Sequence, residues 1–283
     1  MKKAYMTIMI LITVFCVIIG TAMHAFRFMS RIAKLTGRTA ERSSHTIAPG
    51  DGESMEVAPF TTMKLDLGVG NITLMTGDGF DVSYQGVDEL RPVIDSSKEG
   101  KLVIKQKNSN WRSMAKLPDA WGTDNDLVIT VPEDLELEDL DCDLDMGDFR
   151  IEGIRAGKAE ISMQMGNLNL KDSVFKTLQV DADMGNVTID GIEVSKADLD
   201  ANMGNIEAKG ITGFSTLNLD ADLGNIEIAL DQRLEDLSLD LSADLGSVIL
   251  NGEKKNGKIS GGAGAARVSA DADLGSIRIN TAK

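Results

Sequence analysis

A strand-like segment that ends in a large apolar residue followed by glycine recurs seven times in the second half of this chain. In one copy, residues 183–189, a second apolar alternation begins directly after the glycine. Successive motif glycines are 19, 19, 19, 20, 22 and 29 residues apart. Repeats of this length are typical of a solenoid, in which each repeat forms one coil and stacks on its neighbours. The motif glycines are Gly147, Gly166, Gly185, Gly204, Gly224, Gly246 and Gly275.

Apolar and polar residues alternate on both sides of each glycine. Leu178, Val180 and Ala182 alternate with polar residues before the third glycine, and Val187 and Ile189 continue the alternation after it. This period of two is that of a half-buried β-strand. We therefore expect two inward-facing columns to form a stacked core. The column before the glycines is Met146, Met165, Met184, Met203, Leu223, Leu245 and Leu274, and the column after them is Phe149, Leu168, Val187, Ile206, Ile226, Val248 and Ile277.

The glycine and the residue after it predict a tight corner between two strands. Glycine tolerates a positive φ and the close approach of another backbone, where a Cβ would clash. Asparagine tolerates left-handed conformations, and its amide can hydrogen-bond to the same amide one coil away. We interpret the asparagines as a structural ladder rather than a ligand site. They are Asn167, Asn186, Asn205 and Asn225.

These features predict an all-β protein that forms a parallel β-solenoid, or β-helix, of about 19–22 residues per rung. A β-sandwich is disfavoured, because it predicts hairpins between unrelated strands rather than one residue column kept in register. The regular repeats occupy residues 141–283. Residues 60–140 carry one copy of the signature and then longer strands with insertions, so we expect them to form the irregular first part and cap of the solenoid.

The N-terminal residues predict a membrane anchor. Residues 4–23 contain no charge and are long enough to span a bilayer as a helix, so residues 1–25 are expected to be a transmembrane signal anchor preceding the solenoid. A cleaved signal peptide is the rival, because Gly20, Thr21 and Ala22 offer small residues for cleavage. The uncleaved anchor is favoured because the apolar run is longer than a usual signal core.

Two further segments separate the anchor from the repeats. In residues 26–42, Arg27, Arg31, Lys34 and Arg38 recur at helical spacing beside apolar residues, as in a basic amphipathic helix against lipid head groups or a juxtamembrane stop signal. Residues 43–59 are expected to be a linker, and the folded part is expected to begin near Phe60.

Negative charge is concentrated in the repeats. The net charge is −15, but residues 1–42 hold seven Lys and Arg and one acid, so the remainder carries 22 cations against 43 acids, or −21. Nucleic acid is therefore excluded as a partner of the solenoid. Many of the aspartates recur at outward positions before the glycines, and stacked carboxylates repel each other by roughly 1 kcal/mol per pair in water-like surroundings.

A divalent cation such as Ca²⁺ would offset this repulsion, because several carboxylate oxygens satisfy it. The alternative is a solvated acidic face that keeps long β surfaces from aggregating, which the sequence favours because the glycine-rich Ca²⁺ repeat of β-rolls is absent. The candidate Ca²⁺ ligands are Asp181, Asp183, Asp200, Asp220, Asp222, Asp271 and Asp273.

The residue types of the repeats argue against an enzyme. His24 and His45 are the only histidines, and both precede the predicted solenoid, so it has no imidazole base or metal ligand. Cys16 lies in the predicted anchor, and Cys142 has no partner for a disulfide. We expect no catalytic residues and no cofactor beyond Ca²⁺. Trp111 and Trp121 lie in one long insertion, where they either contact a glycan or protein partner or cover the end of the core.

The segments Leu67–Ile72 and Leu127–Pro132, together with the later Met/Leu-Gly-Asn/Ser repeats, resemble the bacterial β-strand-repeat family of unknown function named "putative adhesin". The resemblance covers about residues 60–279. It implies a β-solenoid with a signal or anchor, often in cell-envelope or envelope-stress settings, and it brings no functional residues with it.

Two functions follow from these expectations. The first is a membrane-anchored extracytoplasmic solenoid of the bacterial cell envelope that acts as an adhesin-like interaction or scaffold protein. The second is a scaffold tethered to the cytoplasmic side that polymerises end to end, like bactofilins. Two observations favour the second: the last predicted strand, residues 276–280, is expected to have no capping segment after it, and basic residues after the anchor outnumber Lys2 and Lys3 before it.

Overall fold

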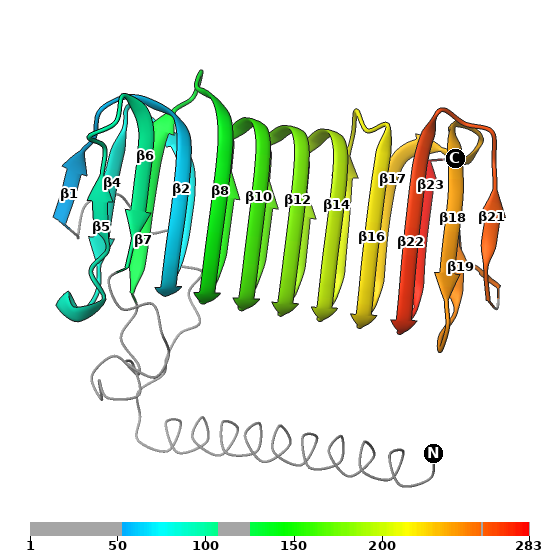
Figure 1. Cartoon of the computed structure of the whole chain (residues 1–283). Helices are drawn as coiled ribbons and strands as arrows, with labels where there is room; N and C mark the ends of the chain where they lie inside the picture. The colour runs from blue at the N-terminus through cyan, green and yellow to red at the C-terminus, as the bar shows by residue number, and fades with distance from the viewer. Residues whose placement is uncertain (1–52, 107–124, 256, 283) are drawn as a thin grey trace, which may run out of the picture. The chain divides into compact units, whose positions relative to one another are not determined.

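The protein forms two long β-sheets that lie face to face in a computed structural model (Figure 1). The structure describes residues 53–106, 125–255 and 257–282. The chain divides into two units, Met1–Ala48 and Pro49–Lys283, and both sheets belong to the second unit. Within the described ranges, no helix is long and apolar enough to cross a bilayer. The predicted anchor, the basic segment and the two tryptophans lie outside these ranges.

The first sheet, which we call the long-strand sheet, contains the strands that precede the motif glycines. Neighbouring strands along it pair in parallel, except at the two outermost positions. In spatial order its strands are β5 (Val93–Asp95), β6 (Gly100–Lys105), β2 (Phe60–Val69), β8 (Glu136–Met146), β10 (Arg155–Met165), β12 (Val174–Met184), β14 (Glu193–Met203), β16 (Thr216–Leu223), β22 (Ala266–Leu274), β18 (Leu237–Ala243) and β21 (Ile259–Gly261).

The second sheet, the short-strand sheet, contains the strands that follow the glycines. In the described part of the chain, the connections include the 3₁₀ turns η1 (Asp88–Leu90) and η3 (Leu234–Asp236). In spatial order its strands are β1 (Glu53–Glu56), β4 (Asp81–Gln85), β7 (Asp126–Pro132), β3 (Asn71–Gly77), β9 (Phe149–Glu152), β11 (Leu168–Lys171), β13 (Val187–Asp190), β15 (Ile206–Ile211), β17 (Ile226–Arg233), β23 (Ile277–Ala282), β19 (Val248–Leu250) and β20 (Glu253–Lys255).

Each repeat forms one rung, with one strand in each sheet. The same repeat position pairs with itself on both neighbouring rungs, as where Leu178 lies between Ala159 and Ala197. A glycine at the corner joins the two strands of a rung, and the next rung continues in the same direction. The predicted all-β architecture of stacked parallel rungs is confirmed, and it is solenoid-like.

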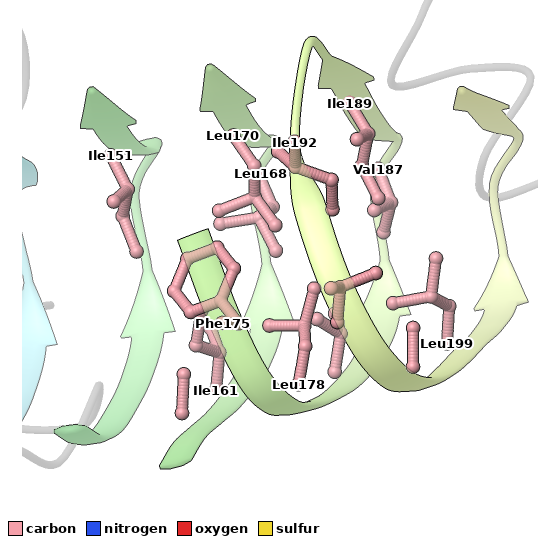
Figure 2. Packing of buried hydrophobic residues seen from close by; sticks show 14 of the residues in the cluster. Ile151, Ile161, Leu168, Leu170, Phe175, Leu178, Val187, Ile189, Ile192 and Leu199 are labelled. Carbon is pink, nitrogen blue, oxygen red and sulfur yellow. The ribbon is translucent and has the colours of Figure 1, made fainter. Parts of the chain in front are cut away.

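The hydrophobic core fills the space between the sheets. Leu178 and Leu199 of the long-strand sheet face Val187 and Ile189 of the short-strand sheet, and all four are at most 1% exposed. Figure 2 shows these side chains pointing toward each other between the ribbons. Burying an aliphatic side chain of this size stabilises the fold by roughly 1.5–3 kcal/mol. The predicted column that follows the glycines, from Phe149 to Ile277, is buried throughout.

The predicted core column before the glycines is wrong. Its residues lie at the corner, where the strand ends and the chain bends, so their side chains lie at the surface rather than between the sheets. Four of them are well exposed, from 41% at Met165 to 73% at Leu245, and Met146, Met184 and Met203 are half-buried. We call this line of side chains the apolar ridge: Met146, Met165, Met184, Met203, Leu223, Leu274 and Leu245.

The last rung in sequence is not the last rung in space. Strands β22 and β23 lie between the rung β16/β17 and the rung β18/β19, and Figure 1 shows red β22 between yellow β16 and orange β18. The chain therefore passes over one position, builds the outer rung, and returns to fill the gap. The prediction that residues 276–280 form an uncovered final strand is wrong, because β23 is paired on both sides.

The other end uses the same arrangement. The rung β6/β7 lies outside the rung β2/β3, although it follows it in sequence. Antiparallel strands then cover both ends: β1, β4 and β5 at one, β20 and β21 at the other. Strand β1 occupies residues 53–56, inside the predicted linker, so the fold begins before Phe60.

The outermost strand β20 carries charges at the positions that pair with core residues. Glu253 and Lys255 of β20 lie opposite the buried residues Leu250 and Val248. Short edge strands with inward-pointing charges hinder pairing with another sheet, because stacking would bury those charges. The prediction of end-to-end polymerisation depended on an uncovered final strand, and the structure has no such strand at β23.

Candidate interaction surface

The glycine corner brings successive rungs into backbone contact. Gly185 has φ +151°, and a Cβ built on it would lie 1.6 Å from the carbonyl oxygen of Gly166. The amide of Gly185 donates a hydrogen bond to the carbonyl oxygen of Met203 at 3.0 Å. Only glycine fits this position, because any side chain would overlap the preceding rung. The same approach recurs along the stack, including Gly246 on Gly275 and Gly275 on Gly224.

The asparagines after these glycines form a continuous hydrogen-bonded line. The Asn186 side-chain nitrogen donates to Asn167 Oδ1 at 3.2 Å, and the backbone amide of Asn186 donates to the same oxygen at 3.2 Å. Asn205 and Asn225 repeat both contacts on the next rungs, and Ser276 N then donates to Asn225 Oδ1 at 3.0 Å. The side-chain amides meet one another's hydrogen-bonding needs and those of the backbone at the corner, which is a structural role.

Seven aspartates cover one side of the long-strand sheet, beside the apolar ridge. Asp181, Asp200, Asp220 and Asp271 lie side by side on four adjacent strands. The residue directly before Met184, Leu223 and Leu274 on the ridge is also an aspartate. We call this surface the aspartate face: Asp181, Asp183, Asp200, Asp220, Asp222, Asp271 and Asp273.

Several carboxylates elsewhere on the rungs have cationic partners. On the short-strand sheet, Lys171 Nζ lies 2.9 Å from Glu152 Oε1, and Lys209 Nζ lies 3.1 Å from Asp190 Oδ2. Among the described residues, the aspartate face forms no ion pair, although Asn202 Nδ2 donates to Asp183 Oδ1 at 2.8 Å. The negative charge of this face is therefore not neutralised within the fold.

The crowding changes the acidity of the central carboxyls. Partial burial, with the neighbouring carboxylates of Asp181 and Asp222, raises the pKa of Asp200. Burial also raises the pKa of Asp220 and of Asp271, again with neighbouring aspartates contributing. A raised carboxyl pKa in the folded state opposes folding at neutral pH, and this cost disappears when the group is protonated.

The candidate Ca²⁺ ligands do not converge on one point. They extend in columns along the strands, and within the described part of the chain no three His, Cys, Asp or Glu side chains are grouped as a metal site. A Ca²⁺ site needs six to eight oxygen ligands around one centre. The residues present therefore do not fit a resident cation, although the columns could attract diffuse cations.

Replacing Asp200 by asparagine should stabilise the protein at pH 7. The change removes a carboxylate from between Asp181 and Asp220, which repel it by roughly 1 kcal/mol each at low salt. Because the folded pKa of Asp200 is raised, its ionisation lowers the stability of wild type as pH rises from about 4 through that pKa, and the variant lacks this contribution. Thermal melts of both proteins at pH 4 and pH 7 measure this.

Asp190→Asn is the matched control, because it removes a carboxylate that is paired with Lys209. This variant should not gain stability at pH 7. A lower melting temperature of Asp200→Asn at pH 7, or an equal gain at both pH values, would contradict the proposed repulsion.

Cys142 is a potential nucleophile that the described repeats place within the core. The thiol is 1% exposed among the residues of β8 and its neighbours. Burial raises its pKa, so the reactive thiolate is disfavoured. This position is that of a packing residue.

Two amide side chains that the sequence did not single out, at positions 106 and 125, form hydrogen bonds with the first rungs. Gln106 Oε1 accepts from the backbone amides of Gly68 and Val69 at 2.9 Å, and its Nε2 donates to Val69 O and Leu90 O. Asn125 is 5% exposed, and its Oδ1 accepts from the Tyr84 hydroxyl at 3.2 Å. Isolated Gln and Asn carry no periodic signal, so only the structure reveals them.

Comparison with solved structures supports the same fold. A "putative adhesin" from Bacteroides fragilis NCTC 9343 is 17% identical, with 81% of this chain and 96% of that chain covered and a TM-score of 0.53. A "putative cell adhesion protein" from Clostridium sporogenes ATCC 15579 has 18% identity, coverage of 82% and 99%, and a TM-score of 0.32. A "putative lipid binding protein" from Parabacteroides distasonis ATCC 8503 has 14% identity, coverage of 82% and 96%, and a TM-score of 0.38. The last two scores are too low to support an argument.

The family comparison covers the repeats more directly. No curated protein matches the chain. The family model described as Toastrack DUF4097 matches residues 60–260, which is more than half of the sequence. This range contains the glycine corner and most of the ridge, and it confirms the resemblance seen in the repeats. The chain therefore belongs to the Toastrack DUF4097 family.

Proposed function

We propose that this protein is a membrane-anchored, extracytoplasmic β-solenoid of the bacterial cell envelope that acts as an adhesin-like interaction surface without catalysing a reaction. The observation that carries the proposal is the unbroken register of its outer surface. The ridge and the aspartate face present similar side chains on successive rungs. An active site would interrupt such a repeat at one place, whereas a docking surface gains from its extent.

The adhesin-like role is also in keeping with the name of the similar structure from Bacteroides fragilis, which refers to adhesion. This name belongs to that protein, and its identity with this chain is 17%. The surface proposed here therefore depends on the residues of this chain, and a protein or glycan is the class of partner it would bind.

The anchoring part of the proposal depends on the sequence of residues 1–25. An uncharged run from residue 4 to residue 23 is long enough for one bilayer crossing. Residues 26–42 would then lie at the lipid head groups, where their basic side chains are favourable. The extracytoplasmic side is proposed because the resemblance seen in the repeats leads us to expect a cell-envelope setting.

A tag after Lys283 tests both the anchor and its orientation. We expect the tagged protein in the membrane fraction, and we expect added protease to remove the tag from intact cells. A variant lacking residues 1–25 should instead be soluble. Lysed cells provide the control for intrinsic protease resistance of the tagged end. A wild-type protein in the soluble fraction would refute the anchor.

One observation favours the opposite orientation. Five basic residues follow the predicted span, at positions 27, 31, 34, 38 and 42, against two before it, and positive residues tend to remain cytoplasmic. The second candidate is therefore a cytoplasmic scaffold tethered to the membrane. Membrane association with a tag protected until lysis would support this candidate and overturn the extracytoplasmic one.

A further inference from the structure

The apolar ridge is unusual because it exposes apolar side chains in a continuous line. Among the described residues, seven large apolar side chains are well exposed, and four of these lie on the ridge: Met165, Leu223, Leu245 and Leu274. A soluble surface exposes single apolar side chains without consequence, but a contiguous apolar line marks a binding site. The ridge therefore differs from single leucines scattered over a surface, because its apolar side chains are contiguous.

The geometry of the ridge limits the shape of its occupant. The ridge residues from Met146 to Leu274 lie directly beside one another on adjacent strands, as in Met184 beside Met203 and Leu223 beside Leu274. Leu245 follows the end of β18, and its backbone amide donates to Asp273 O on the neighbouring rung. Strands in a sheet are about 4.8 Å apart, so seven rungs extend for about 30 Å. An α-helix of about 20 residues has the same length.

The border of the ridge limits the charge of its occupant. Asp222, Asp273 and Asp244 directly precede Leu223, Leu274 and Leu245, and within the described ranges these three carboxylates form no ion pair. A second copy of this surface would bring two acidic borders together, and an anionic bilayer would also be repelled. Cationic groups beside an apolar face are complementary to both features.

We propose that the apolar ridge and its acidic border bind a basic amphipathic α-helix of a partner polypeptide. The apolar side of the helix would cover the ridge, and its Lys or Arg side chains would pair with the border carboxylates. This is a helix-on-surface mode of recognition, in which apolar anchors give affinity and charge gives orientation. The proposal rests on the function proposed above, since it specifies the partner of that surface.

The test uses the full chain in nanodiscs of zwitterionic lipid and three fluorescent 20-residue model peptides. One is a basic amphipathic helix of Leu and Lys, one is its acidic Leu and Glu counterpart, and one has the basic composition in scrambled order. We expect saturable binding of the basic helix alone, after subtraction of empty discs. Binding should weaken as salt increases.

Two triple variants separate the two parts of the site. Leu223→Ser, Leu274→Ser and Leu245→Ser shorten the ridge on three adjacent rungs, and Asp222→Asn, Asp273→Asn and Asp244→Asn neutralise the border of the same rungs. We expect each to weaken binding at least tenfold, and the second to reduce the salt dependence. Leu234→Ser is the control, since Leu234 is 40% exposed but lies outside the ridge. It should bind like wild type.

Several results would overturn the assignment. Binding that both triple variants retain, or equal binding of the acidic or scrambled peptide, places recognition elsewhere. Ridge-dependent capture by anionic vesicles without peptide would identify a lipid surface instead. Failure of the chain to co-purify with nanodiscs refutes the anchor alone, because the same titration in buffer still tests the ridge. Melting temperatures show that each variant is folded.

Discussion

Replacing Gly185 by valine is expected to destabilise the protein by at least about 4 kcal/mol, which is the range of severe single substitutions. A Cβ at this position would lie 1.6 Å from Gly166 O and 2.6 Å from Gly166 C, and both are backbone atoms that cannot rotate away. The corner would have to open, which would also break the hydrogen bond from Gly185 N to Met203 O. Thermal and urea unfolding measure the loss, expected to lower the melting temperature by on the order of 10 °C.

Gly79→Ala is the matched control. A Cβ at Gly79 meets no atom within 4 Å, and this residue lies in the turn between β3 and β4. The control should change stability by no more than about 0.5 kcal/mol, as surface substitutions usually do. Equal stability of Gly185→Val and wild type would show that the rungs do not approach as closely as described.

The sequence predicts the rungs because their determinants are local and repeated. The alternation around Leu178 and Val187 defines the inward faces, and the glycine spacing defines the coil length. The asparagine ladder follows from the same alignment, since Asn167 and Asn186 occupy equivalent positions one coil apart. Each of these inferences needs only one repeat and its period.

The sequence pattern assigned the apolar ridge to the core because strand alternation does not indicate where the chain bends at the corner. Met184 has the same parity as buried Ala182 and Val180, so the pattern assigns it to the core. It is the last residue before the bend at Gly185, where the strand geometry ends and the side chain lies at the surface. The residues with the strongest case for function were therefore predicted to be structural.

The spatial order of the last rungs could not be predicted from the sequence either. Ser247 and Ser276 follow equivalent glycines. The alignment of repeat positions is therefore the same whichever of these two rungs lies outside. The signal is the 29-residue spacing before Gly275, which contains β20 and β21. A long spacing indicates an insertion, but it does not reveal that the chain returns to an inner position.

Deleting residues 266–283 should disrupt the solenoid far more than removal of a terminal rung would. The deletion removes β22 and β23, which pair on one side with β16 and β17 and on the other with β18 and β19. The outer rung would lose its contact with the stack, and buried Ile226 and Val248 would lose Ile277 between them. Hydrogen exchange should show loss of protection in β18 and β19, which the deletion leaves in the chain.

Cysteine pairs distinguish the two rung orders directly. Ser276 N lies 3.0 Å from Asn225 Oδ1 on the adjacent rung, whereas Ser247 lies one rung farther, at about twice the 4.8 Å strand spacing from Asn225. A disulfide requires Cα atoms within about 7 Å, so Asn225→Cys with Ser276→Cys should oxidise, and Asn225→Cys with Ser247→Cys should not. The reverse pattern, with β18 still protected after the deletion, would mean that the rungs stack in the order of the sequence. In that case β22 and β23 would form the outer rung, and the end of the solenoid would be open to pair with another copy.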